Sequence, residues 1–223
     1  NHMIIMPDAD LDQAADALLG AGYGAAGERC MAISVAIPVG EETADKLIEK
    51  LIPRIETLKV GPYTAGNDVD YGPVITSAAK ENILKLVQSG IDQGAKLVVD
   101  GRDFNLQGYE DGFFVGPHLF DNVTSDMDIY TKEIFGPVLA IQTFRTVDEV
   151  ITKANNTPYG LSAGVWTDKG SKIFNLTSQL KAGVVWANTY NKFDPTSPFG
   201  GYKESGHGRE GGLHGLEPYL KFD

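Results

Sequence analysis

The chain has 223 residues, of which 42% are hydrophobic and 22% are charged, and its formal net charge is −11. This balance is typical of a globular protein, and the length is sufficient for one large domain with a sizeable core. The acidic charge argues against nucleic acids and anionic membranes as partners, because both attract clustered Lys and Arg. No apolar run reaches the roughly 18 residues of a membrane-spanning helix.

The single cysteine, Cys30, excludes an internal disulfide framework and fits a reducing compartment. We expect a cytoplasmic location, with the mitochondrial matrix as the alternative for a eukaryotic source. The first residues are apolar but too short and too poor in basic residues for a signal peptide, and they begin like a strand in mid-course. We therefore expect the natural protein to start upstream.

The predicted elements begin with a short buried strand over residues 4–6. Asp8 or Asp10 can cap a helix over residues 11–19, where apolar side chains recur at helical spacing. A run of glycines loosens the end of this helix. A strand rich in β-branched residues is then expected over residues 33–39.

The rest of the chain continues the alternation of helices and strands. Helices are expected over residues 43–58, 77–94, 147–155 and 169–180. Strands are expected over residues 96–99, 113–119, 138–144, 163–167 and 183–188, and a glycine-rich tail follows from residue 197. This alternation predicts an α/β architecture with a largely parallel sheet. No internal repeat or linker interrupts it, so we expect a single domain over residues 1–223.

Cys30 is the first candidate for chemistry. A lone cysteine is commonly an inert small hydrophobic residue, but this one lies between a loop of small residues, 24–27 (GAAG), and a buried strand. The small residues would let a ligand approach the backbone, and Arg29 would favour the thiolate, which is the reactive form. No histidine is nearby in the sequence, so a Cys–His pair is neither supported nor excluded. Spacing alone leaves the catalytic and the inert interpretations open.

Other familiar sites are not supported. Residues 22–27 and 206–211 both match the glycine pattern of a dinucleotide-binding loop, but neither copy follows a strand and opens a helix, as that loop requires. No phosphate-binding Gly-Lys-Ser/Thr triplet and no Gly-x-Ser-x-Gly segment occurs. The four histidines lack ligand spacing, and one cysteine cannot form a thiolate zinc site, so we expect no metal.

Five segments together resemble the aldehyde dehydrogenase superfamily. They are residues 7–12 (PDADLD), 27–30 (GERC), 133–138 (EIFGPV), 155–163 (NNTPYGLSA) and 198–206 (PFGGYKESG). They occur in the family's order and cover essentially the whole chain. The resemblance implies the catalytic portion of this fold, a three-layer α/β domain with a largely parallel sheet, and a cofactor-binding domain that is mostly absent upstream.

The resemblance also implies roles for residues near the nucleophile. Cys30 would attack the aldehyde carbon to give a thiohemiacetal, which passes hydride to NAD or NADP and becomes a thioester. The Cys30 backbone N–H would help to hold the oxyanion. Glu133 would accept hydrogen bonds from the nicotinamide ribose, and Phe135 would pack near the nicotinamide. Without the resemblance, Glu133 would be interpreted as a solvated acid and Phe135 as a core residue.

Three further residues gain roles in the same way. Phe199 would line the aldehyde tunnel, Asn188 would lie near the active site, and Glu210 would relay protons to the general base. Without the resemblance, Phe199 would be interpreted as core packing, while a strand-end cap is the alternative for Asn188 and a surface acid the alternative for Glu210. These alternatives remain open at the level of sequence.

Some of the family's machinery would lie outside this sequence. The general-base Glu of a Glu-Leu-Gly-Gly segment would precede Asn1, as would the Rossmann strands and the Asn that shares the oxyanion hole. We therefore expect the isolated chain to have no dehydrogenase activity. The full-length protein is expected to form a homodimer or homotetramer and to act on a small aldehyde or semialdehyde.

The branch within the family is divided along the chain. Residues 1–139 resemble methylmalonate-semialdehyde dehydrogenase, in which CoA releases the thioester, whereas the tail from Asn155, with Glu210, resembles hydrolytic aldehyde oxidisers. We favour the acylating branch, because it concerns the residues nearest Cys30, and we interpret Arg29 as the residue that pairs with a substrate carboxylate. A mosaic of the two branches, a hydrolytic broad-range dehydrogenase and a non-catalytic module on the same fold are the alternatives.

Overall fold

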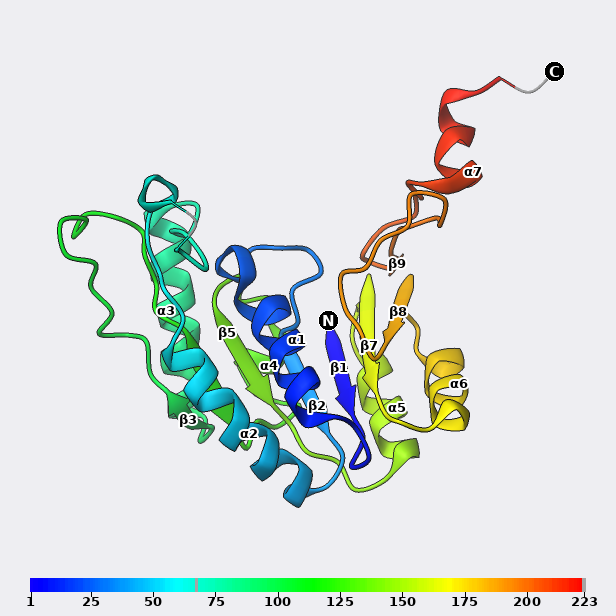
Figure 1. The fold of residues 1–223 in the computed structure, drawn as a ribbon, viewed down its shortest axis with the longest axis horizontal. Helices are drawn as coiled ribbons and strands as arrows, with labels where there is room; N and C mark the ends of the chain where they lie inside the picture. Colours follow the sequence, from blue (N-terminus) through cyan, green and yellow to red (C-terminus); the bar gives the residue numbers. More distant parts are fainter. Residues whose placement is uncertain (67, 222–223) are drawn as a thin grey trace.

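The computed structural model describes residues 1–66 and 68–221 and contains one central sheet of seven strands (Figure 1). The strands are β1 (His2–Ile5), β2 (Val35–Pro38), β3 (Lys96–Val99), β4 (His118–Asp121), β5 (Val138–Ile141), β7 (Ser162–Trp166) and β8 (Val184–Ala187). Their order is β3-β4-β5-β2-β1-β7-β8, and every pair is parallel except β3 with β4. The predicted α/β architecture with a largely parallel sheet is confirmed.

Helices cover both faces of the sheet. They are α1 (Leu11–Tyr23), α2 (Glu41–Glu56), α3 (Ser77–Asp92), α5 (Val147–Asn155) and α6 (Gly170–Gln179). Helices α1 and α2 lie side by side on one face (Figure 1). The connection through α1 runs from β1 towards β2, whereas α5 and α6 lead in the opposite direction along the sheet. Because such crossovers are right-handed, α5 and α6 cover the other face, which gives three layers.

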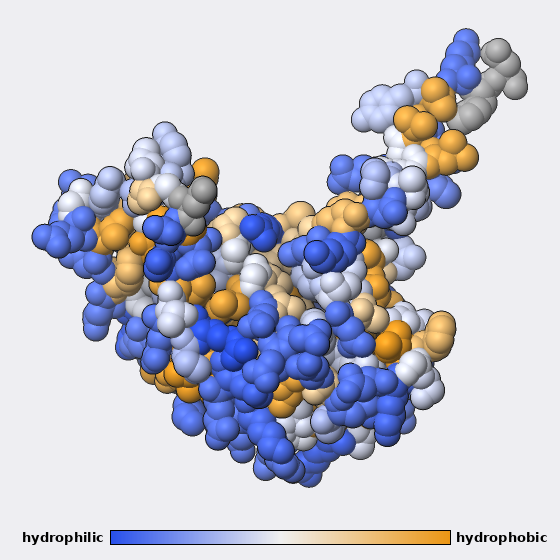
Figure 2. All heavy atoms as spheres, in the orientation of Figure 1, coloured by the Kyte–Doolittle hydropathy of each residue, from blue (hydrophilic) through white to orange (hydrophobic). Residues whose placement is uncertain are grey.

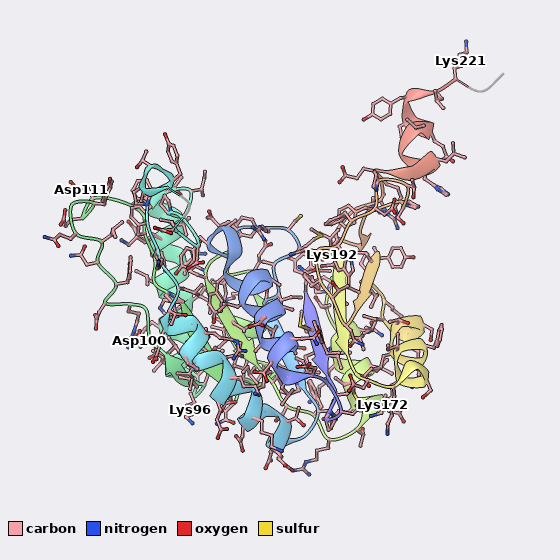
Figure 3. The ribbon with its side chains drawn as sticks, viewed as in Figure 1. Lys96, Asp100, Asp111, Lys172, Lys192 and Lys221 are labelled. Carbon is pink, nitrogen blue, oxygen red and sulfur yellow. The ribbon has the colours of Figure 1, made fainter. Side chains whose placement is uncertain are left out.

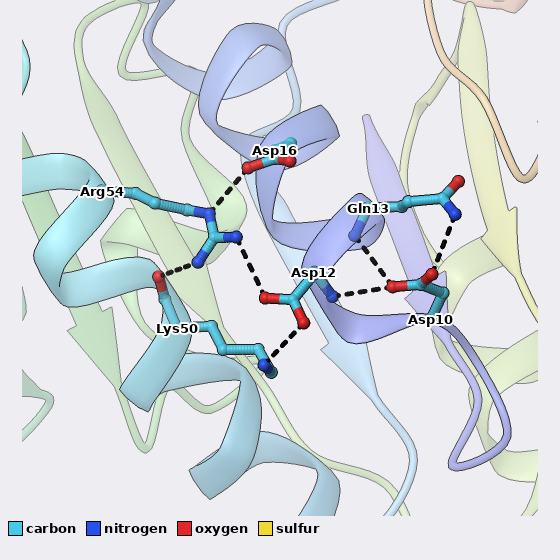
Figure 4. A network of polar contacts seen from close by, with 6 residues as sticks. All are labelled: Asp10, Asp12, Gln13, Asp16, Lys50 and Arg54. Carbon is cyan, nitrogen blue, oxygen red and sulfur yellow. Dashed lines mark hydrogen bonds and ion pairs between the residues drawn. The ribbon is translucent and has the colours of Figure 1, made fainter.

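Polar contacts join α1 to α2 on their exposed sides (Figure 4). Asp10 is the N-cap of α1, and its carboxylate accepts hydrogen bonds from two backbone N–H groups of the first turn. Within α1, Asp12 pairs with Lys50 and Arg54 of α2 at 2.8 and 3.0 Å, and Asp16 pairs with Arg54 at 2.7 Å. These carboxylates are solvent-exposed, so the pairs fix the relative orientation of the helices more than they add to stability.

Asp8, the other cap candidate, lies at the carboxyl edge of the sheet instead. It accepts a hydrogen bond of 2.8 Å from Lys172 and bonds of 3.0 and 3.1 Å from the Thr167 hydroxyl. Figure 3 shows Lys172 on α6, in the lower part of the view. Asn188 also bonds there, since its side chain accepts from the Thr167 N–H and donates to the Thr167 carbonyl. This edge is therefore tied together by side chains of residues that follow β1, β7 and β8.

Several element boundaries differ from the prediction. The predicted strand over residues 113–119 is wrong for most of its length, because β4 begins only at His118. The first helix continues through its glycines to Tyr23, where packing of α1 on the sheet outweighs their low helix propensity. A second, two-stranded antiparallel sheet of β6 (Tyr159–Gly160) and β9 (Tyr202–Lys203) was not predicted, and its pairing joins segments that are distant in the sequence.

The C-terminal tail projects from the body (Figure 1) and contains two short helices, α7 (Gly212–Leu216) and η3 (Glu217–Tyr219). Figure 2 shows hydrophobic residues along this projection, where the exposed apolar side chains are Leu213, Leu216, Tyr219 and Leu220. Within the described residues, no helix has the length and hydrophobicity needed to cross a membrane.

His118 is a buried histidine on β4, and neither ring nitrogen has a hydrogen-bond partner among the described residues. Burial lowers the pKa of His118 to about 4, because an imidazolium in the core would lose its hydration. The unfolded chain therefore takes up this proton at a higher pH than the folded chain does. Neutral His118 contributes its full stabilisation above pH 6.5, the ordinary histidine pKa, and the protein loses this stabilisation as the pH falls towards 4.

We expect this one group to lower the free energy of unfolding by about 3 kcal/mol as the pH falls from 6.5 to 4. Urea unfolding at a series of pH values measures the slope of the free energy of unfolding against pH. In His118→Leu the fall between pH 6.5 and 4 should be smaller by about 3 kcal/mol. His214→Asn, at an exposed position of α7, should keep the wild-type slope. Equal slopes for the wild type and His118→Leu would show that His118 does not cause this pH dependence.

Candidate functional site

An open pocket of about 280 Å³ lies at the amino-terminal edge of the parallel strands. It forms where β1, β2, β5 and β7 begin, at His2, Val35, Val138 and Leu161. Its lining includes Arg29, Cys30, Tyr130, Glu133, Phe135, Gly136, Thr157 and Glu204. In open α/β sheets ligands commonly bind at the carboxyl edge. Here side-chain contacts among β1, β7 and β8 hold that edge together, and the opposite edge carries the candidate site.

Cys30 lies at the corner of a tight turn and is solvent-exposed. The Ala32 N–H donates to the Arg29 carbonyl at 3.0 Å, which makes Cys30 and Met31 the two central residues of a β-turn. The positive-φ residues of the described chain do not include Met31, so the turn is of type I rather than type II. Among the hydrogen bonds of the described residues, none uses the Cys30 N–H, which leaves it free to donate to a ligand.

Asn1 holds this turn from the side of β1. Its side-chain amide donates to the carbonyls of Cys30 and Ala32, both at 2.9 Å. Its amide oxygen accepts from the Ser162 N–H at the start of β7, at 3.1 Å. One side chain therefore ties the turn at residues 29–32, called the nucleophile turn after its candidate nucleophile Cys30, to two strands, and no local sequence pattern identified Asn1 beforehand.

The bend before Cys30 depends on unusual backbone conformations. Within η1 (Gly24–Gly27), Ala25 and Ala26 have φ values of 53° and 56°, in the left-handed region that disfavours a side chain. Gly27 has a φ of 71°, and a Cβ built there would lie 2.1 Å from the Gly136 carbonyl oxygen. The bend is thus pressed against a segment that lies more than a hundred residues later in the sequence.

That close approach brings Glu133 and Phe135 to the same pocket as Cys30. Phe135 has a φ of 53° and is 41% exposed, so its ring is held at the pocket rather than in the core. A bulky residue in this conformation is strained, and such strain is concentrated at functional sites. Glu133 is exposed, and its carboxylate is in no ion pair within the described residues.

Arg29 precedes the turn and packs over Gly24. A Cβ at position 24 would lie 2.9 Å from an Arg29 guanidinium nitrogen and 3.2 Å from the central guanidinium carbon. Because Gly24 has no side chain, the Arg29 guanidinium can pack directly against the loop. Arg29 is exposed and forms no ion pair with a described residue, so it can accept an anionic group.

The remaining predicted site residues do not line this pocket. Phe199 stacks edge-on against Phe193, with ring centroids 5.2 Å apart, and pairs through its backbone with Glu210. Glu210 is exposed on the tail. Asn188 bonds to Thr167 at the carboxyl edge of the sheet, which is the geometry of a strand-end cap. The functional roles of these three residues remain predictions.

The two-stranded sheet of β6 and β9 and the residues next to it supply another part of the pocket lining. The Lys203 ammonium group donates to the carbonyls of Asn155 and Thr157 at 2.8 and 2.9 Å, and burial lowers the pKa of Lys203. These bonds hold Thr157 at the pocket and place Glu204 beside it. The sequence analysis recognised both segments as motifs but did not predict that they pair.

These residues fit the nicotinamide end of a dinucleotide. An exposed aromatic ring, an unpaired carboxylate and an exposed thiol share one pocket of the described chain, and the carboxylate can accept hydrogen bonds from ribose hydroxyls. In the described residues, no group of three or more His, Cys, Asp or Glu side chains could hold a metal ion.

Comparison with known proteins places these features in a family. The aldehyde dehydrogenase family model matches residues 1–223. A protein of Sinorhizobium meliloti 1021, assigned as a methylmalonate-semialdehyde dehydrogenase and solved with NAD, is 52% identical with a TM-score of 0.95, covering 99% of this chain and 45% of its own. The mitochondrial acylating methylmalonate-semialdehyde dehydrogenase of Arabidopsis thaliana is 45% identical over 84% of this chain and 30% of its own length.

A third relative comes from a different branch. The betaine aldehyde dehydrogenase of Staphylococcus aureus, in a structure whose cysteine is modified by β-mercaptoethanol, is 35% identical with a TM-score of 0.93. The alignment covers 99% of this chain and 44% of that protein. The chain thus spans less than half the length of the relatives it matches. On the family match and these identities, the chain belongs to the aldehyde dehydrogenase family.

Proposed function

We propose that the chain is the cysteine-bearing catalytic portion of an NAD(P)-dependent aldehyde dehydrogenase. The observation that carries this proposal is the convergence at one pocket of Cys30, Glu133 and Phe135 from distant parts of the sequence. Because the chain spans less than half of its relatives, the activity is proposed for the full-length protein. The isolated chain is expected to be inactive. Cytoplasmic location and a homodimeric or homotetrameric state remain expectations.

In this mechanism the Cys30 thiolate adds to the aldehyde carbon, and the carbonyl oxygen becomes an oxyanion. The free Cys30 N–H donates a hydrogen bond to that oxyanion as the C–S bond forms. Bound NAD or NADP supplies a hydride acceptor, and loss of hydride from the thiohemiacetal carbon leaves a thioester on Cys30. Glu133 holds the nicotinamide ribose, and Phe135 limits the position of the nicotinamide ring.

The proposed substrate class is a semialdehyde that carries a carboxylate. Arg29 adjoins Cys30, is exposed and has no ion-pair partner in the described chain, so its guanidinium can bind a carboxylate in a bidentate manner. Two relatives are described as methylmalonate-semialdehyde dehydrogenases, one of them as acylating, which supports CoA as the acceptor of the acyl group. Release by water is the alternative, for which Glu210 on the tail would be the proton relay.

Thiol labelling tests the proposed nucleophile directly, because Cys30 is the only cysteine in the chain. At pH 7, iodoacetamide should alkylate the folded wild-type chain roughly tenfold faster than the same chain unfolded in urea, because the folded turn presents the exposed Cys30 sulfur next to the cationic residue Arg29. Mass spectrometry of the intact chain follows the reaction. A folded thiol that reacts no faster than the unfolded one would instead support a non-catalytic module on this fold.

The carboxylate hypothesis predicts a substrate-dependent effect of Arg29→Leu in the full-length enzyme. The Michaelis constant for a semialdehyde acid should rise by roughly 10- to 100-fold, the value of a lost charged hydrogen bond. The constant for a simple aliphatic aldehyde should change less than threefold, because that substrate has no carboxylate to lose. Arg29→Lys keeps the charge but not the planar guanidinium group. Its Michaelis constant for the semialdehyde acid should lie between those of the wild type and Arg29→Leu. Equal changes for both substrates would eliminate this role.

A further inference from the structure

Tyr190 approaches the nucleophile turn from the face of β7. Its ring stacks on Trp186 with centroids 4.7 Å apart, and it is 8% exposed. Gly164 in the centre of β7 makes room for it, because a Cβ there would lie 3.3 Å from a Tyr190 ring carbon. The ring therefore runs along the strand towards the amino edge, where the turn lies.

The tyrosine hydroxyl joins two groups at that edge. It lies 2.9 Å from the Met31 carbonyl oxygen and 2.8 Å from the Ser162 hydroxyl. A carbonyl can only accept, so the Tyr190 hydroxyl must donate to Met31, and the Ser162 hydroxyl must then donate to Tyr190. The Met31 carbonyl on the nucleophile turn therefore fixes the donor and the acceptor in both buried hydrogen bonds.

One peptide plane links this chain to the turn beside Cys30. The plane between Met31 and Ala32 carries the Met31 carbonyl at one end and the Ala32 N–H at the other. Tyr190 binds the carbonyl, and the Arg29 carbonyl accepts from the N–H, which is the hydrogen bond that closes the turn. Both ends of the plane are thus held, and release of one end would let it rotate and break the other bond.

We propose that Tyr190, oriented by Ser162, is a positioning residue that keeps the turn closed and so fixes the direction in which the Cys30 thiol is presented. Asn1 holds the neighbouring carbonyls of Cys30 and Ala32. The carbonyls of three successive residues, 30–32, therefore accept hydrogen bonds from side chains of the protein. The catalytic meaning of this role rests on the proposed nucleophilic function of Cys30. The hydrogen bonds of Tyr190 with Ser162 and with the turn do not depend on that function.

Two variants remove the contact in different ways, and a third is a matched control. Tyr190→Phe deletes the hydroxyl and keeps the ring stack, and Ser162→Ala deletes only the group that orients it. Tyr71→Phe is the control, because the Tyr71 hydroxyl also donates to a backbone carbonyl, that of Val115, at 3.0 Å from a buried position outside the pocket lining. All three can be studied in the 223-residue chain.

Native-state amide exchange at Ala32, followed by NMR, reports closure of the turn. Exchange should be at least roughly tenfold faster in Tyr190→Phe and faster in Ser162→Ala, while Tyr71→Phe keeps the wild-type rate to within about twofold. Unchanged exchange in Tyr190→Phe, or equal acceleration in Tyr71→Phe, would overturn the proposal. If Tyr190→Phe does not fold, the comparison of Ser162→Ala with Tyr71→Phe decides in the same way.

Alkylation of Cys30 at pH 7 gives a readout that a purely structural role would not change. In Tyr190→Phe the rate constant should fall towards that of the urea-unfolded chain, while Tyr71→Phe keeps the wild-type value. A wild-type rate in Tyr190→Phe would also overturn the proposal. A wild-type thiol that is already inert, together with faster Ala32 exchange in Tyr190→Phe, would reject the proposed function and leave Tyr190 as the residue that closes the turn.

Discussion

Cys30→Ala in a full-length enzyme that contains this chain is expected to lower kcat for aldehyde oxidation by roughly 10⁴-fold or more, because the proposed covalent intermediate forms on this sulfur. Cys30 is the only cysteine of the 223-residue chain, so these residues contain no second thiol that could replace it. Aldehyde-dependent formation of NADH measures the rate, and the binding of NAD measured separately shows whether the variant remains folded.

Two outcomes would contradict this expectation. A Cys30→Ala enzyme that keeps more than about a tenth of the wild-type kcat would show that the reaction does not pass through this sulfur. NADH production by the isolated 223-residue chain would show that the expected upstream general base and cofactor domain are dispensable. In the first case the family assignment would stand and the mechanism would fail.

Gly27→Ala is expected to lower the free energy of unfolding by about 4 kcal/mol, the sum of a left-handed backbone penalty and an overpacking penalty. The φ of Gly27 is 71°, and the new Cβ would meet the Gly136 carbonyl oxygen at 2.1 Å. The two loops must then separate, which carries Glu133 and Phe135 away from Cys30. Urea unfolding and the alkylation rate of Cys30 measure the two consequences.

Gly20→Ala is the matched control for this substitution. Gly20 lies inside α1, and a Cβ there meets nothing within 4 Å. Alanine should therefore stabilise the chain by about 0.5–1 kcal/mol through its higher helix propensity. If Gly27→Ala were as well tolerated as Gly20→Ala, the close contact between the two loops would not exist in solution.

The two expectations depend on different links between sequence and site. Cys30→Ala tests a residue that the sequence already singled out through its motif and its small-residue bend. Gly27→Ala tests a contact between loops that lie more than a hundred residues apart, which no local pattern predicts. If Cys30→Ala lost activity as expected but Gly27→Ala were not destabilised, Cys30 would react in a site whose geometry differs from that of the structure.

The sequence by itself determined the α/β class, through the alternating helical and strand periodicity of short segments. It indicated the family through five ordered segments that resemble aldehyde dehydrogenases. Cys30 was a candidate from its own surroundings, whereas Glu133 and Phe135 became candidates only through that resemblance. The sequence also placed most strands and helices to within a few residues. It was wrong over residues 113–117, where no strand forms, because apolar residues can be buried without pairing in a sheet.

Only the tertiary structure decided where the site lies and what supports it. The strand order β5-β2-β1-β7 brings the beginnings of four strands together, and hydrophobic periodicity contains no information about that order. The same order brings Asn1 and Tyr190 to the nucleophile turn and leaves Asn188 at the opposite edge of the sheet. Contacts across the sheet depend on strand neighbours, so residues that act through such contacts are visible only once the chain has folded.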